Sequence, residues 1–331
     1  MENLNMENDG LFKNRIDLNP VQDAAIKLKQ EISKVLVGQD RMVDMILIAI
    51  LSNGHVLIEG VPGVAKTLTA KLISKMIAAG FSRIQFTPDL MPSDVLGTTI
   101  FNNKILEFEF KQGPIFSNII LIDEINRAPA KTQSALFEVM EERQVTIDGN
   151  TYKMDSPFLV FATQNPIEHE GTYRLPEAQL DRFLFRINIT YPTLEEENQL
   201  LINANKRKEK KELDEVGIIM KLEEVLSYQK VVKHVHIEEN LIKYIAELVN
   251  TTRNHPSLYL GASPRTSINI LNSSKSCAAL NGRDFVTPGD IQYVLYPVLN
   301  HRLYVTPEKE LEGENVDDVI KDIIKSVDVP K

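Results

Sequence analysis

The sequence predicts an α/β fold, in which a five-stranded parallel sheet covered by helices is followed by a smaller all-α domain. Five short runs rich in β-branched or aromatic residues alternate with helical or loop segments. Most of these runs are apolar on both faces, as in a parallel sheet that helices cover. They comprise residues 55–59, 84–87, 119–122, 158–163 and 185–189. After Pro192 the strand signals stop and helical patterns follow, so we expect a domain boundary there.

These patterns divide the chain into a flexible tail (1–20), an α/β core (21–192) and a helical domain (193–331). The tail is polar and shows no periodicity. In the core, apolar residues recur at helical spacing over 21–35, and residues 41–51 form a second, more buried helical pattern. The helices expected in the second domain are residues 195–208, 238–253, 264–280 and 288–295, the last one opened by a capping box at Thr287 and Asp290.

Two antiparallel additions interrupt the core. Leu106, Phe108 and Phe110 alternate with charged residues, which is the period-2 pattern of a strand with one wet face. Residues 144–147 and 151–154 flank Asp-Gly-Asn, a strong hairpin signal. We therefore expect two antiparallel elements beside the parallel sheet.

The composition of the 331-residue chain narrows the classes of function. A net charge of −9 gives no electrostatic support for binding nucleic acid, and the basic cluster at 206–211 is interpreted as a solvated surface. Cys277 is the single cysteine, which excludes an intramolecular disulfide and fits a cytoplasmic protein. No apolar run approaches the roughly 18 residues that span a bilayer, so no membrane insertion is expected.

A phosphate-binding loop is the strongest motif. It joins the first predicted strand to a helix over 68–79, the context that such a loop requires, and the dipole and N–H groups of that helix favour a polyphosphate. Lys66 would reach the β- and γ-phosphates, and the Thr67 hydroxyl would complete a Mg²⁺ shell. Because alanine avoids positive φ, we expect Gly63 or Gly60, and not Ala65, to take the left-handed conformation. The nucleotide-binding segment comprises Gly60, Val61, Pro62, Gly63, Val64, Ala65, Lys66, Thr67 and Leu68.

Two carboxylates follow the apolar run at 119–122. Because ligands of open α/β sheets bind at the carboxyl ends of the strands, Asp123 and Glu124 are expected to face Thr67. Asp123 would hold Mg²⁺ through water, and Glu124 would polarise the water that attacks the γ-phosphate. An acidic residue in the second position favours a hydrolase over a phosphoryl transferase.

Three further polar residues have alternative interpretations. Asn165 follows a strand and would orient the attacking water, although an asparagine before proline also forms turns. Arg182 precedes the fifth predicted strand and, from its sequence neighbours, would pair with Asp181 or Glu177 on a helix surface. Arg265 stands in the first turn of a helix, where the dipole disfavours a cation, so it needs an anion, for which bound phosphate is one candidate.

Taken together, these motifs resemble the MoxR family of AAA+ ATPases over residues 35–299. The stretches 123–145 and 171–183 carry the most specific part of the resemblance. They contain the runs Asp-Glu-Ile-Asn-Arg-Ala-Pro and Leu-Pro-Glu-Ala-Gln-Leu-Asp-Arg-Phe. In this family an alanine before the loop lysine is usual.

The resemblance implies a role for each site residue. Lys66 and Thr67 match the Walker A motif, and Asp123 and Glu124 the Walker B motif. Asn165 matches sensor 1, Arg265 matches sensor 2 on the helical lid, and Arg182 matches the arginine finger that enters the neighbouring subunit's site. Residues 37–39, including Gln39, match the segment at the adenine, residues 106–110 match a hairpin facing the ring pore, and Arg174 is a second candidate interface arginine.

The implied activity is Mg²⁺-dependent hydrolysis of ATP to ADP, coupled to remodelling or maturation of a protein client. Hexameric rings and a partner with a von Willebrand factor A domain are the family expectations. A magnesium-chelatase-like or nucleic-acid-directed AAA+ motor is the alternative, and an ATP-sensing scaffold without turnover is a third possibility that the water-activating carboxylate disfavours.

Overall fold

A computed structural model describes residues 16–61, 63–104, 106–165, 173, 175–208 and 210–330 of the chain. Residues 1–15 of the predicted tail lie outside this range, and the first helix begins at Asn19. Within these described residues, no helix is both long and apolar enough to cross a bilayer.

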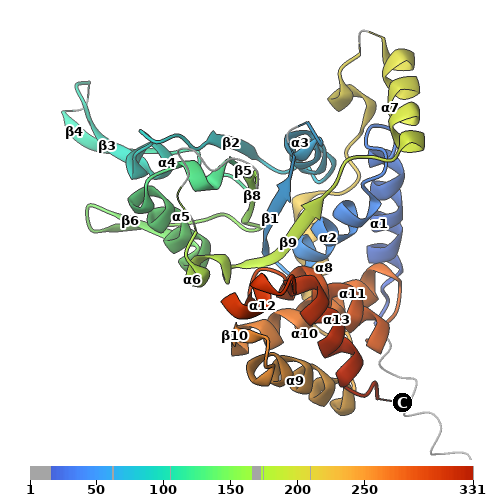
Figure 1. Cartoon of the computed structure of the whole chain (residues 1–331). Coiled ribbons are helices and arrows are strands. Elements are labelled where there is room, and N and C mark those ends of the chain that lie inside the picture. Colours follow the sequence, from blue (N-terminus) through green and yellow to red (C-terminus); the bar gives the residue numbers. More distant parts are fainter. Residues whose placement is uncertain are drawn as a thin grey trace, which may run out of the picture.

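The predicted parallel sheet is confirmed. Its five strands lie in the order β2-β5-β8-β1-β9, and every neighbouring pair is parallel (Figure 1). The strands are β1 (His55–Gly60), β2 (Phe81–Gln85), β5 (Ile119–Asp123), β8 (Leu159–Gln164) and β9 (Phe183–Ile189). Because all five run the same way, their carboxyl ends meet at one edge, where loops can bring distant residues together.

Alternate residues of the strands face two separate apolar layers. Ile119 and Leu121 pack with α1, α2 and α3, whereas Ile120 and Ile122 pack with α4 and α5 on the other face. Both sets are buried, which explains why residues 119–122 of β5 are apolar throughout. The core helices are α1 (Asn19–Ile32), α2 (Asp40–Leu51), α3 (Lys66–Met76), α4 (Pro92–Leu96), α5 (Ala130–Glu142) and α6 (Glu177–Leu180), with a 3-10 turn at Ile125–Arg127.

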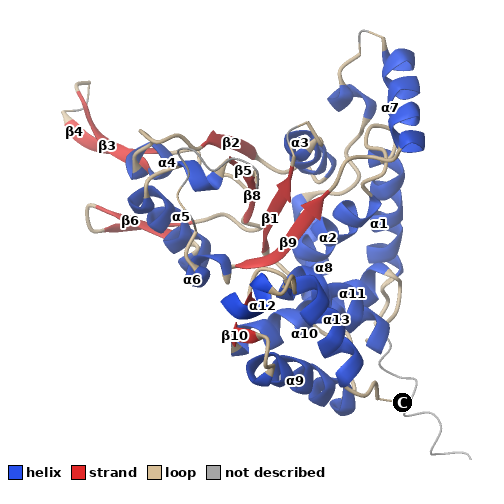
Figure 2. Ribbon diagram, viewed as in Figure 1, coloured by secondary structure: helices blue, strands red, loops and turns tan. Residues whose placement is uncertain are grey.

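Two β-hairpins extend from the α4–α5 side of the sheet (Figure 2). One consists of β3 (Gly97–Asn102) and β4 (Glu107–Gln112), and the other of β6 (Gln144–Ile147) and β7 (Asn150–Lys153). The hairpins are joined to each other: the Thr99 hydroxyl donates to Asp148 Oδ2 at 2.5 Å, and the rings of Phe110 and Tyr152 lie 4.4 Å apart. The strand expected at 106–110 is therefore confirmed over Glu107–Gln112, but its apolar face is not buried, since Phe108 is 76% exposed. Its partner β3 is an element that the sequence patterns did not indicate.

The second part of the chain is mainly helical but not all-α. A short antiparallel pair, β10 (Leu258–Leu260) and β11 (Tyr304–Val305), corrects that expectation. Its helices are α7 (Leu194–Arg207), α8 (Leu222–Val232), α9 (Glu239–Asn254), α10 (Pro264–Leu280), α11 (Pro288–Leu299), α12 (Pro307–Leu311) and α13 (Val316–Ser326), with a 3-10 turn at Glu212–Glu215. The capping box at Thr287 is confirmed, since its backbone N–H donates to Asp290 Oδ2 at 2.8 Å.

The segment between α7 and α8 packs on the core, although it follows the predicted boundary. Lys75 of α3 donates to the Leu213 carbonyl at 2.6 Å, and the N–H groups of Ile219 and Met220 both donate to the Met76 carbonyl. Helices α8 to α11 then share one buried apolar cluster with α1, α2 and α3. The two parts of the chain are therefore held together by a continuous core.

A buried histidine at the start of β1 makes stability depend on pH. His55 Nδ1 accepts a hydrogen bond from the Val160 N–H at 3.0 Å, so the opposite nitrogen carries the proton and donates to the Met140 carbonyl at 3.1 Å. Burial, reinforced by the charge of Arg143, lowers the pKa of His55 to about 4 from its ordinary 6.5. The folded chain thus resists taking up a proton that the unfolded chain accepts below pH 6.5.

We expect His55 to remove about 2 kcal/mol from the free energy of unfolding between pH 7 and pH 5. The sign follows because the unfolded state binds more protons in that interval. Urea unfolding at both pH values should show a smaller loss for His55→Gln than for the wild type. The exposed His234 offers the control substitution, and identical losses in the wild type and His55→Gln would contradict the prediction.

Candidate functional site

The loop between β1 and α3 has the geometry of a phosphate-binding loop. A Cβ at Gly60 would lie 2.8 Å from the Ile189 carbonyl of β9, so only glycine allows the two strands to end this close together. Gly63 has φ +87° and open space where a Cβ would stand. Lys66 begins α3, and its ammonium donates to the Gly60 carbonyl at 2.6 Å across the mouth of the loop. Pro62 lies outside the described residues.

The left-handed conformation is not confined to the glycines. Ala65, the N-cap of α3, has φ 59°, contrary to the expectation that alanine would avoid it. A left-handed alanine costs roughly 1–2 kcal/mol. The turn from the loop into the helix imposes this conformation because Ala65 already accepts the first helical hydrogen bond, from the Thr69 N–H at 2.9 Å. Gly63 does take a positive φ, as expected.

Thr67 and Asp123 meet at the carboxyl edge of the sheet, although 56 residues separate them. The Thr67 hydroxyl lies 3.5 Å from Asp123 Oδ2, and the Thr163 hydroxyl of β8 donates to Asp123 Oδ1 at 3.1 Å. Asp123 is 7% exposed. Hydroxyl and carboxylate oxygens are the ligands that Mg²⁺ prefers in proteins, and that ion usually completes its shell with water and substrate phosphate. The pair therefore fits a magnesium ion held together with a phosphate group.

Glu124 stands beside this pair in a left-handed conformation, with φ 57°. Its backbone N–H donates to the Thr163 hydroxyl at 3.1 Å, so one threonine fixes both carboxylate residues. The Glu124 side chain accepts from Gln85 Nε2 at 2.9 Å and forms an ion pair with Arg127 at 3.2 Å. Its carboxylate is thus oriented by two groups, from β2 and from the turn after β5, while Thr163 of β8 fixes its backbone.

Strand β2 contributes two residues that the sequence analysis missed. Arg83 Nε donates to Asp123 Oδ2 at 2.6 Å, and Gln85 binds Glu124 as described above. Both lie on one face of β2, which pairs with β5 in a register that sets Gln85 opposite Asp123. The alternation of polar residues around the buried Ile84 was the available signal. Among the described residues, no group of three or more histidine, cysteine or acidic side chains forms a ready metal cluster.

A cavity of about 360 Å³ lies beside the loop, between the start of α2, the end of β9 and α11. Gln39 lines it, as do the apolar side chains of Met42, Met45 and Pro297. Ile189, which contacts Gly60, also lines the cavity and so connects it to the phosphate loop. The charged side chains of Arg41, Arg186 and Glu196 also line the cavity. Asn165 directly follows β8, at the same edge of the sheet as Asp123.

Arg182 and Arg265 lie at the opposite edge. Arg182 precedes β9, whose first residue pairs with His55 while its last pairs with Gly60. Seven residues of extended strand, about 20 Å, therefore separate it from the phosphate loop of its own chain. Its guanidinium donates to the Phe137 carbonyl of α5.

Arg265 lies on the same side as Arg182, because its partner Glu141 is four residues after Phe137, the partner of Arg182, on α5. It forms two hydrogen bonds with Glu141, at 2.7 and 3.1 Å, so the anion that its helix position requires is a carboxylate of this chain. The assignment of Arg265 as a phosphate-binding residue stays a prediction. Arg174 lies outside the described residues.

Comparisons with known proteins agree with this geometry. A model of the ATPase family associated with various cellular activities (AAA) matches residues 55–185, and a model of the AAA lid domain matches residues 250–323. The chain is 46% identical to the uncharacterised protein YeaC of Bacillus subtilis, over 95% of this chain and 96% of that one. It is 44% identical to the chaperone MoxR1 of Mycobacterium tuberculosis, over 91% and 81% of the two chains.

A solved structure is similar as well. The crystal structure of a proposed ATPase from Cytophaga hutchinsonii superposes with a TM-score of 0.85 at 43% identity. It covers 95% of this chain and 99% of the other. Core and helical domain therefore both have a counterpart of the same arrangement.

Proposed function

The chain belongs to the MoxR family of AAA+ ATPases, and on that premise we propose that it hydrolyses ATP with Mg²⁺ to remodel protein clients. The observation that carries the proposal is the meeting of Thr67 and Asp123, 3.5 Å apart, at the mouth of a phosphate-binding loop. Residues distant in the chain, each suited to one part of a magnesium–triphosphate group, converge at one edge of the sheet.

Each group has a defined task in this proposal. Backbone N–H groups at the start of α3 and the Lys66 ammonium bind the phosphates, and Lys66 leaves the Gly60 carbonyl to do so. Thr67 and Asp123 hold the magnesium ion, which supplies charge neutralisation for the β- and γ-phosphates. Glu124 orients and polarises the attacking water, with Asn165 at the adjoining strand end as a second water-orienting group.

The proposal includes a ring of subunits. Arg182 lies at the edge of the sheet opposite its own phosphate loop, so it can complete only the site of another chain. Arg265, bound to Glu141 on the same side, faces the same way. Repeated head-to-tail contacts of this kind close into a ring, and a hexamer is the ring we propose.

A protein client is supported by the exposed end of the β3–β4 hairpin. Leu106 and Phe108 are 73% and 76% exposed, and Phe101 packs against Phe108 with ring centroids 5.3 Å apart. Exposed apolar side chains on a protruding hairpin are typical of a polypeptide-binding surface. The contacts between the β3–β4 and β6–β7 hairpins stabilise this surface.

We expect Lys66→Ala to abolish ATP binding and hydrolysis, because the loop loses the charge that meets the β- and γ-phosphates. Lys71→Ala on the same helix is the matched control and should retain both. Fluorescent-nucleotide binding and phosphate release, each with Mg²⁺ and with EDTA, provide the measurement. Turnover by Lys66→Ala at the control's rate would overturn the proposed function.

A further inference from the structure

Arg302, between α11 and β11, is a buried arginine that neither the motifs nor the proposed mechanism use. Its side chain is 2% exposed. Burial lowers the pKa of Arg302, and the Asp181 carboxylate opposes that effect and keeps the guanidinium charged. A charge in this position is stable only when every N–H finds an acceptor.

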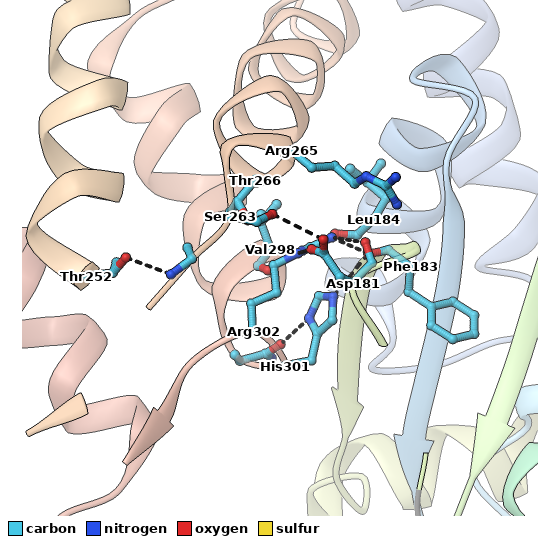
Figure 3. Close-up of polar contacts among 12 residues, drawn as sticks. Asp181, Phe183, Leu184, Thr252, Ser263, Arg265, Thr266, Val298, His301 and Arg302 are labelled. Carbon is cyan, nitrogen blue, oxygen red and sulfur yellow. Dashed lines mark hydrogen bonds and ion pairs between the residues drawn. The ribbon is translucent and has the colours of Figure 1, made fainter. Parts of the chain in front are cut away.

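The acceptors of Arg302 lie on both sides of Arg182 in the chain. Nε donates to the Asp181 carboxylate at 2.6 Å, and Nη2 donates to the backbone carbonyls of Asp181 at 3.1 Å and Phe183 at 2.5 Å. Nη1 donates to the Leu184 carbonyl at 3.2 Å and to the Val298 carbonyl of α11 (Figure 3). The guanidinium thus fixes the backbone before and after Arg182.

Other groups of the helical domain reinforce the same turn. Ser263, the N-cap of α10, donates to the second oxygen of the Asp181 carboxylate at 3.1 Å. His301 shares the Phe183 carbonyl with Arg302, at 3.1 Å, and Asn300 donates to the Arg186 carbonyl at 3.1 Å. The helical domain therefore holds the backbone on both sides of Arg182, in addition to the hydrogen bonds that Asp181 and Arg182 donate to α6 of the core.

We propose that Arg302 is a positioning residue for Arg182, through which the helical domain of one subunit sets hydrolysis in the site of the next subunit. This inference rests on the proposed function, in which Arg182 acts in trans. Arg302 touches neither nucleotide nor water. It holds the Asp181–Leu184 turn so that the Arg182 side chain, when it leaves the Phe137 carbonyl, points to the neighbouring chain.

The test uses mixed assemblies of full-length chains. Arg302→Lys keeps the charge but loses the planar fork that reaches several carbonyls at once. We expect its kcat to fall tenfold or more, while the affinity of its own site for fluorescent ATP stays within twofold. Adding excess Glu124→Gln chains, which hydrolyse ATP far more slowly but present an intact Arg182, should restore phosphate release per Arg302→Lys chain at least fivefold, after the release by Glu124→Gln alone is subtracted.

Recovery in the mixture separates positioning from general damage, because a variant whose own site is distorted gains nothing from a sound neighbour. Asp181→Asn removes the same ion pair at constant side-chain volume, so it should show the same fall in kcat and the same recovery as Arg302→Lys. It replaces Arg302→Lys in the test if that variant does not fold. Arg283→Lys is the matched control: Arg283 forms a two-bond pair with the buried Asp290 elsewhere in the helical domain, both at 2.6 Å. Its kcat should stay within twofold of the wild type.

A second mixture, Arg182→Ala with Glu124→Gln, tests the trans role of Arg182 separately from the positioning role of Arg302. If it fails to recover activity, the trans role of Arg182 in the proposed function is wrong. If it recovers while both Arg302→Lys and Asp181→Asn do not, or if those two variants turn over normally alone, the positioning role of Arg302 is wrong and the proposed function stands.

Discussion

Glu124→Gln should bind ATP as tightly as the wild type and hydrolyse it about 10²–10⁴-fold more slowly. Glutamine keeps the length of the side chain and can still accept from Gln85, but it has no carboxylate to polarise water. Nucleotide affinity should stay within about threefold, because the residue orients water and does not hold the phosphates. Phosphate release and fluorescent-nucleotide binding on the same preparation measure the two effects separately.

The control for this substitution is Glu223→Gln on the exposed face of α8, which should retain full turnover. A loss of binding in Glu124→Gln would place the carboxylate on the metal or the phosphates. Wild-type turnover would remove Glu124 from the mechanism altogether.

Arg182→Ala should lower kcat by about 10³–10⁵-fold, the range for arginines that stabilise the charge of a transferring phosphoryl group. The loss should appear in kcat and leave the affinity of each subunit's own site unchanged, since about 20 Å of strand separates Arg182 from that site. The wild type should also show specific activity that rises with protein concentration as subunits associate. Steady-state kinetics over a range of protein concentrations measure both.

Lys153→Ala, an exposed charge on the β6–β7 hairpin, provides the comparison for removing a long cationic side chain from the core. If Arg182→Ala retains concentration-dependent activity equal to this comparison, hydrolysis does not depend on the arginine of a neighbour. In that case Arg182 has a structural role, through its contact with the Phe137 carbonyl.

Strands β5 and β8 could be predicted because they are buried on both faces, which leaves an uninterrupted apolar run. Strand β3 gives no such signal, since its residues are largely half-exposed or exposed and its partner β4 decides its structure. The strand order β2-β5-β8-β1-β9 could not be predicted from local sequence patterns, because it depends on how the crossover helices pack. The β10–β11 pair is short and forms only where the helical domain brings its ends together.

The same distinction applies to the site. Thr67 and Asp123 were predicted to meet because motif spacing and the common edge of parallel strands determine their positions. Arg83 and Gln85 were missed because their contacts require β2 to lie next to β5, which the sequence does not state. The partner of Arg265 is 124 residues away, and that contact exists only once the helical domain is docked on the core.

The continuous apolar cluster under the sheet has a mechanical consequence. Val56 and Ile58 of the core lie in one cluster with Ile291 and Val298 of the helical domain, all of them fully buried. Hinging the two parts of one chain would expose this interior to water, at roughly 25 cal/mol for each Å² of apolar surface uncovered. The shared apolar cluster therefore opposes a hinge motion between the α/β core and the helical domain of one chain.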